Sequence, residues 1–187
     1  YHDFSSPFSY LAFTQIKRIS SQYGFNLTLK PILIGALFRE IGTPNVPLFE
    51  MNRSKQTYML KDIHDWAHYW GVDFNFPPHF PLRSVLPLRA SLIEPSLSAE
   101  LYRAYWVEGR NISINSVVED IANKNGINGQ ELCQKTQSKA IKEQLISNTE
   151  EAVSLGVCGV PTFKWNNQLW WGQDRLLSLV EHVTKKV

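Results

Sequence analysis

The chain has 187 residues, of which 43% are hydrophobic and 19% charged, and this balance is typical of a globular protein with a sizeable core. The net charge of +2, with no long basic run, argues against nucleic acid as a partner and favours a small anionic ligand. No apolar stretch could span a bilayer and no signal peptide is evident, so no membrane partner is expected. Cys133 and Cys158 form neither a disulfide framework nor a metal set, which favours a reducing, cytoplasmic location.

The first 31 residues are predicted to form a strand, a helix and a second strand. Tyr1–Phe4 is the end of the first strand, so a preceding segment stays an open alternative. The helix begins after Ser6, its predicted N-cap, and ends near Tyr23, before Gly24. Asn26–Pro31 alternates between apolar and polar residues, as a half-buried strand does. Together these segments predict a βαβ unit.

The middle of the chain, from about residue 37 to 149, carries helical patterns and no convincing strand. Loops are expected at 42–47 and 76–81, where proline and glycine gather. The predicted helices are Met59–Trp70, Leu86–Ile93, Ala99–Glu108 and Ala140–Ser147, with two more that start at the capping signals Ser116-x-x-Glu119 and Asn128-x-x-Glu131.

The last segment returns to β structure. Thr162–Trp165 and Gln168–Trp171 flank Asn166-Asn167, a turn pair that predicts a hairpin, and Asp174 is expected to cap a final helix. The pattern is therefore βαβ, a helical block and ββα. This predicts one α/β domain, residues 1–36 and 155–187, interrupted by an all-helical insertion over residues 37–154.

Two short motifs carry the candidate chemistry. Ser6-Pro7-Phe8-Ser9 has the spacing of a redox Cys-x-x-Cys motif with oxygen at both sulfur positions, so it cannot form a disulfide. A hydroxyl at a helix start can still stabilise a sulfur anion, although Ser6 could be only a helix cap. In Gly159-Val160-Pro161-Thr162, a cis Val160–Pro161 bond would present the Val160 backbone to a ligand, although such turns are also purely structural.

These motifs, followed by Trp170-Trp171-Gly172-Gln173-Asp174-Arg175-Leu176, resemble the DsbA-type thioredoxin superfamily. Within it they look like 2-hydroxychromene-2-carboxylate isomerases and the related kappa-class glutathione transferases, over nearly the whole chain. The resemblance implies a DsbA-like thioredoxin fold with a helical insertion, a homodimer, and glutathione as the cofactor.

The resemblance also implies roles for individual residues. Ser6 matches the catalytic serine that hydrogen-bonds the glutathione thiolate, which would lower the pKa of the thiol. Val160 and Pro161 match the turn that pairs with the cysteinyl backbone of glutathione. Gln173 and Asp174 match the positions that hold its γ-glutamyl end, and the alternative for Asp174 is a simple N-cap.

Two further positions are weaker matches. Asn45 lies where the family has a loop asparagine near glutathione, although such residues usually only make turns. Arg83 matches an arginine near the organic substrate, where a guanidinium suits a carboxylate, with Arg89 as a neighbouring competitor. His64 and His68 could share a helix face, but with no third ligand nearby no metal site is expected.

The leading hypothesis is a glutathione-dependent isomerase that interconverts 2-hydroxychromene-2-carboxylate and trans-o-hydroxybenzylidenepyruvate in aromatic catabolism. One alternative is a kappa-type glutathione transferase or peroxidase. Another, from a different class, is a redox-inactive thioredoxin-fold binding module. Cys158 is expected to be a small buried residue, and the aromatic residues of the helical block, Trp66, Trp70, Tyr102, Tyr105 and Trp106, are expected in the core.

Overall fold

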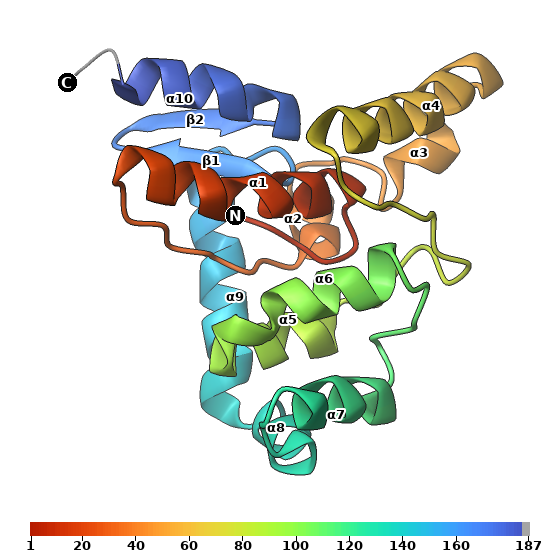
Figure 1. Ribbon diagram of the computed structural model, residues 1–187, viewed down its shortest axis with the longest axis vertical. Helices are drawn as coiled ribbons and strands as arrows, with labels where there is room; N and C mark the ends of the chain where they lie inside the picture. Colours follow the sequence, from red (N-terminus) through yellow and green to blue (C-terminus); the bar gives the residue numbers. More distant parts are fainter. Residues whose placement is uncertain (185–187) are drawn as a thin grey trace.

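The computed structural model describes residues 1–184. Figure 1 shows β1 and β2 lying between α1 and α10, while α9 leads from these strands to a lower group formed by α5 to α8. The elements are α1 (Pro7–Tyr23), α2 (Ile34–Glu40), α3 (Pro47–Glu50), α4 (Arg53–Trp70), α5 (Val85–Ile93), η1 (Pro95–Leu97), α6 (Ser98–Trp106), α7 (Asn115–Lys124), α8 (Gly129–Lys135), α9 (Lys139–Ser154), β1 (Thr162–Trp165), β2 (Gln168–Trp171), η2 (Gln173–Arg175) and α10 (Leu176–Thr184). No helix in this part of the chain is long and apolar enough to cross a membrane.

The predicted hairpin is confirmed. β1 and β2 pair antiparallel, with Thr162 opposite Trp171 and Trp165 opposite Gln168. Asn166 adopts a positive φ of 51° in the turn, a conformation that asparagine tolerates better than most residues.

The two strands predicted near the N-terminus are reduced to a single parallel bridge between His2 and Pro31. The N–H of His2 donates to the carbonyl of Lys30 at 3.1 Å, and the Tyr1 nitrogen donates to the carbonyl of Thr162 at 2.7 Å. The predictions of strands at 1–4 and 26–31 are therefore wrong in extent. The pairing stops after His2 because the Asp3 carboxylate accepts the Ser5 N–H and folds the chain into a turn.

The core fixes both ends of α1. Ile16 and Ile19 of α1 pack against a buried cluster on α10, while Leu11 and Phe13 join the larger core of the helical block. The Trp106 indole N–H donates to the Phe4 carbonyl at 2.9 Å, which holds the turn that leads into α1. Of the aromatic residues expected in the core, Tyr102, Tyr105 and Trp106 are fully buried, whereas Trp66 and Trp70 are partly buried.

Helix starts agree with the capping signals in part. Asn128 is the N-cap of α8, and its side chain accepts the Glu131 N–H at 3.1 Å, as predicted. The prediction for Ser116 is wrong, because α7 begins one residue earlier and its N-cap position, Ile114, makes no side-chain bond. Asp174 is not an N-cap either, since it lies inside η2, whose N-cap position is Gly172.

The short helices α2 and α3 have no counterpart in the prediction. Both lack a side-chain cap, so neither carries the start signal that marks α1 or α8. The division into a thioredoxin-like domain and an insertion stays a prediction. α9 ends at Ser154, next to one predicted boundary, and α2 runs across the other at residue 36.

Candidate active site

Ser6 joins two motifs that are 154 residues apart in the chain. It is the N-cap of α1, as predicted, and its hydroxyl oxygen accepts the Ser9 N–H at 3.2 Å. The same hydroxyl donates to the carbonyl of Val160 at 3.1 Å. The peptide bond between Val160 and Pro161 is cis. The folded chain therefore brings the helix start and the proline turn into direct contact.

The start of α1 offers hydrogen-bond donors to an anion. Ser9 and Tyr10 direct their N–H groups to Ser6, and Pro7 has none. Within residues 1–184, the N–H of Phe8 has no acceptor, so it is free for a ligand. Together with the helix dipole and the Ser6 hydroxyl, this amide favours a negative charge at the position that a sulfur would take.

Ser6 lies on the wall of a cavity of about 770 Å³, a size typical of small-molecule sites. Ser6, Asn45, Arg83 and Val160 all line this cavity, so the structure brings four of the predicted site residues together. Much of the remaining wall is apolar, with phenylalanine and methionine side chains from α1 to α4 and from the 76–81 loop. A second, smaller cavity of about 300 Å³ lies beside residues 25–30 and includes Pro161 but not Ser6.

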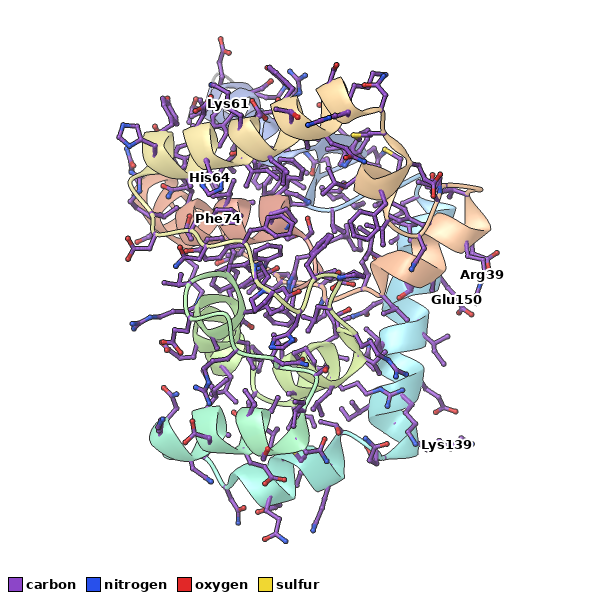
Figure 2. All side chains as sticks on the ribbon, turned by 90° about the vertical axis from the view of Figure 1, so that its right-hand side faces the viewer. Arg39, Lys61, His64, Phe74, Lys139 and Glu150 are labelled. Carbon is purple, nitrogen blue, oxygen red and sulfur yellow. The ribbon has the colours of Figure 1, made fainter. Side chains whose placement is uncertain are left out.

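The charged residues that line the larger cavity, Arg39 and Arg83, are both cationic. The Arg83 side chain has no salt-bridge partner in the described chain, whereas Arg89 is half-buried on α5 and does not line the cavity. Arg39 lies at the outer surface of α2, as Figure 2 shows. An apolar chamber with cations and no carboxylate on its wall suits an apolar ligand that carries a negative charge.

Asn45 is exposed in the loop before α3, and it reaches the first turn of α2. A Cβ atom on Gly35 would lie only 2.9 Å from the Asn45 side-chain oxygen, so the glycine makes room for this approach. Cys158 also lines the cavity and is exposed, so the expectation of a buried cysteine is wrong. It lies in the loop after α9, where the chain turns toward Val160, rather than in an apolar element.

Gln173 and Asp174 lie outside the set of residues that line this cavity. Gln173 is buried, and its side-chain oxygen accepts the Trp70 indole N–H at 2.6 Å. Asp174 is exposed and close enough to Asp62 of α4 to act on its charge: burial, and then the carboxylates of Asp65 and Asp174, raise the pKa of Asp62. Carboxylates that raise one another's pKa in this way favour a cation nearby.

Asp62 was missed by the sequence analysis, and Trp70 was expected only in the core. Both are on α4, which the apolar spacing of the sequence predicts correctly, but nothing in that spacing shows that α4 packs near η2. His64, from the same helix, packs edge-on against Phe74 with ring centroids 5.0 Å apart (Figure 2). In the described residues no group of three His, Cys, Asp or Glu side chains could hold a metal ion.

Gly159 controls the position of Trp171 at the cavity wall. A Cβ atom at residue 159 would lie 2.5 Å from the Trp171 indole nitrogen, so Gly159→Ala is expected to push the indole aside. For glutathione, the ligand that the motif resemblance implies, we expect the Kd to rise about tenfold, equivalent to about 1.4 kcal/mol. Calorimetric titration measures this, and an unchanged Kd would show that Trp171 does not shape the binding site.

Comparisons with known proteins agree with this geometry. A family model described as a DSBA-like thioredoxin domain matches residues 1–184. The chain is 28% identical over 183 residues to a 2-hydroxychromene-2-carboxylate isomerase of Pseudomonas putida, covering 96% of this chain and 90% of that one. It is 27% identical over 203 residues to glutathione S-transferase kappa 1 of Homo sapiens, covering 98% and 88%.

Solved structures give the same result. A structure of a 2-hydroxychromene-2-carboxylate isomerase superposes with a TM-score of 0.88 at 26% identity, covering 99% of this chain and 93% of that one. The cytosolic disulfide reductase DsbM from Pseudomonas aeruginosa shares the fold, with a TM-score of 0.66 at 15% identity and coverage of 100% and 97%. The resemblance that the three motifs predict and the DsbA-like thioredoxin fold are therefore confirmed.

Proposed function

Because this chain belongs to the DSBA-like thioredoxin domain family, we propose that it is an enzyme, a glutathione-dependent isomerase that interconverts 2-hydroxychromene-2-carboxylate and trans-o-hydroxybenzylidenepyruvate. The observation that carries the proposal is the bond between Ser6 and Val160 at the wall of an apolar cavity with cationic residues. In this arrangement, hydrogen-bond donors suited to a thiolate lie beside the Val160 backbone, with which a peptide can pair. The relatives named as isomerases support the reaction.

The groups around Ser6 fit glutathione. Ser6 would donate to its sulfur together with the free Phe8 N–H, and the Val160 backbone would pair with its cysteinyl unit, because no residue in 1–184 accepts the Val160 N–H. Asp174 would hold the ammonium of its γ-glutamyl end, with Asp62 close enough to add to the negative charge there, and Asn45 would contact glutathione from the cavity wall. When bound, glutathione supplies a nucleophilic thiolate that can add to an electrophilic carbon and leave again.

The chain's own groups would then orient the organic substrate. The apolar wall would hold its aromatic or enone part, and Arg83 would pair with its carboxylate. A cavity that buries most of the substrate also keeps water from the thiolate, which protects the reacting carbon from hydrolysis.

A kappa-type glutathione transferase is the second candidate, and the similarity to kappa relatives over nearly the whole chain favours it. In that case the conjugate would be released instead of being returned to an isomer. Conjugation of a chloronitrobenzene without isomerase activity would support the transferase. A redox-inactive binding module would instead bind peptides and stabilise no thiolate. The homodimer and the cytoplasmic location stay predictions from the resemblance and from the cysteines.

The first experiment is calorimetric titration with glutathione, with ultraviolet absorbance of the bound sulfur recorded in parallel. We expect binding with thiolate formation at neutral pH, followed by isomerase activity toward the chromene carboxylate. Binding without thiolate absorbance, or no binding at all, would contradict the proposed function.

Arg83→Gln is expected to raise the KM for the carboxylate substrate about 10- to 100-fold, because a charge-assisted hydrogen bond contributes about 1.5–3 kcal/mol. The Kd for glutathione should change little. Arg89→Gln is the matched control, since Arg89 does not line the cavity. Equal KM values in the two variants would remove Arg83 from the substrate site.

A further inference from the structure

Asp3 is a fully buried carboxylate that lies directly behind the cavity wall. One of its oxygens accepts both the N–H and the hydroxyl of Ser5, each at 2.9 Å. The other accepts the Ile34 N–H at 2.9 Å, and the Ser84 hydroxyl lies close enough to the carboxylate to lower its pKa. Since Ser5, Ile34 and Ser84 all line the cavity, one side chain holds three separate segments of its wall.

Among the described residues, no cation compensates the charge of Asp3. In residues 1–184 the carboxylate has no salt-bridge partner, and each group hydrogen-bonded to it is a donor, which suits the ionised form. From α6, the Tyr102 hydroxyl donates to the Asp3 carbonyl at 3.4 Å. Burial, and then the charge of the Asp3 carboxylate, raise the pKa of Tyr105. The neighbouring His2 ring is held neutral by burial. Burial also raises the pKa of Asp3, and the hydrogen bonds to the carboxylate oppose this effect.

An uncompensated buried anion becomes less favourable when a second anion arrives beside it. The thiolate proposed at Ser6 would be that second anion. Ser5 directly precedes Ser6 in the chain, is only half-buried, and connects the Asp3 carboxylate to the cavity through its hydroxyl. A hydroxyl in this position can accept a proton from the cavity side while it donates its own proton to the carboxylate.

We propose that Ser5 and Asp3 form a proton relay that receives the thiol proton when glutathione binds beside Ser6, an inference that rests on the proposed function. The thiol proton moves to Ser5 Oγ as the Ser5 hydroxyl proton moves to Asp3 Oδ1. Afterwards the Ser5 hydroxyl donates to the sulfur, the Ser6 hydroxyl turns from the Val160 carbonyl to the sulfur, and neutral Asp3 donates to Ser5. One proton crosses each hydrogen bond, so the charge moves from the carboxylate to the sulfur and the net charge of the complex is unchanged.

The other hydroxyls near the site are less suited to this step. The Ser6 hydroxyl donates to Val160 and accepts from Ser9, and it makes no bond to Asp3. Ser84 contacts Asp3 but is buried, with 3% of its surface exposed. Ser5 therefore would touch the thiol, and Asp3 would act through Ser5.

The test counts the protons released when glutathione binds. Calorimetry at pH 7 in phosphate and in Tris, two buffers with different ionisation enthalpies, gives the number of protons released, and ultraviolet absorbance gives the thiolate formed. With the relay, the wild-type protein forms a thiolate but releases almost no proton to the buffer. Ser5→Ala and Asp3→Asn should release close to one proton for each thiolate, or should bind glutathione without forming a thiolate.

Ser91→Ala is the matched control, because it removes a buried serine hydroxyl that bonds to Leu88, away from the cavity. Ser5→Ala keeps the backbone bond of Ser5 to Asp3, so it tests the relay even where Asp3→Asn prevents folding. In the wild type and in Ser91→Ala, the infrared difference spectrum on adding glutathione should show a protonated carboxylic acid. A residue that only supports the structure would produce no such band.

A wild-type thiolate accompanied by release of one proton would overturn the relay and leave the proposed function standing. Ser5→Ala indistinguishable from the wild type would also overturn it, as would Ser84→Ala with the phenotype expected of Ser5→Ala. Wild-type binding without a thiolate would overturn the proposed function, and the relay with it.

Discussion

Ser6→Ala is expected to reduce kcat/KM for isomerisation about 100- to 1,000-fold, the loss typical of removing one donor from a site where negative charge is stabilised. The Ser6 hydroxyl is the side-chain donor at the start of α1 that contacts Val160. Without it, a sulfur at this position would lose one of its side-chain donors and keep the helix amides, the dipole and the Ser5 hydroxyl. The pKa of bound glutathione should rise, so the thiolate absorbance at neutral pH should fall with the rate.

Ser6→Ala also removes a helix cap, which typically costs about 1 kcal/mol of stability. Ser138→Ala is the matched control, because Ser138 caps α9 through the same type of bond and does not line the cavity. We expect the two variants to lose similar stability in urea, while only Ser6→Ala loses activity. A similar loss of rate in both variants would show that Ser6 is a cap and nothing more.

Acid is expected to lower the free energy of unfolding through the protonation of His2. Burial lowers the pKa of His2 from its ordinary value of 6.5 to about 3. Its Nδ1 lies 2.9 Å from the Tyr102 hydroxyl, and its Nε2 is buried without a hydrogen-bond partner in the described chain. A proton on this ring would therefore place an unpaired charge in the core.

The direction in which the free energy of unfolding changes with pH depends on which state, folded or unfolded, binds the proton. Between pH 6.5 and about 3 the unfolded chain protonates His2 and the folded protein does not, so the free energy of unfolding falls as the pH falls. The loss is at most about 1.4 kcal/mol for each pH unit in this window. Urea unfolding at a series of pH values from 7.5 to 4.5 measures it.

His2→Leu separates this effect from the general titration of carboxylates. Leucine cannot bind a proton, so the variant should lose less stability than the wild type over the same pH range, even where its stability at pH 7.5 is lower. If the two proteins show the same pH dependence, His2 is not the group that titrates on unfolding.

Local structure was predicted well at several signals that lie in neighbouring residues. Short-range backbone preferences account for Ser6 at the start of α1, for Gly24 at the end of α1, and for the hairpin turn at Asn166. The predicted capping signal at Ser116 is wrong because packing of the apolar face of α7 places its start at Asn115 without a side-chain cap. Capping contributes about 1 kcal/mol, so core packing can override it.

The candidate site was predicted only in part, for a related reason. Ser6, Val160 and Arg83 could be named because they belong to recognisable motifs, yet their meeting at one cavity depends on how α1, the proline turn and the start of α5 pack. Asp62 carries no motif of its own, and its proximity to Asp174 exists only once α4 lies beside η2. The exposed position of Cys158 is likewise set by the path of the loop after α9.

The sequence by itself determined the longer helices, the hairpin, the family and the residue types of the Ser6 motif, because each depends on contiguous residues and short-range hydrogen bonds. Tertiary structure alone decided which of those groups share a cavity and which are turned elsewhere, as with Gln173, which bonds to Trp70. It also decided the pKa values of the buried titratable groups. His2 and Asp3 are ordinary titratable residues in the sequence, and their shifted pKa values arise from the water that folding removes around them.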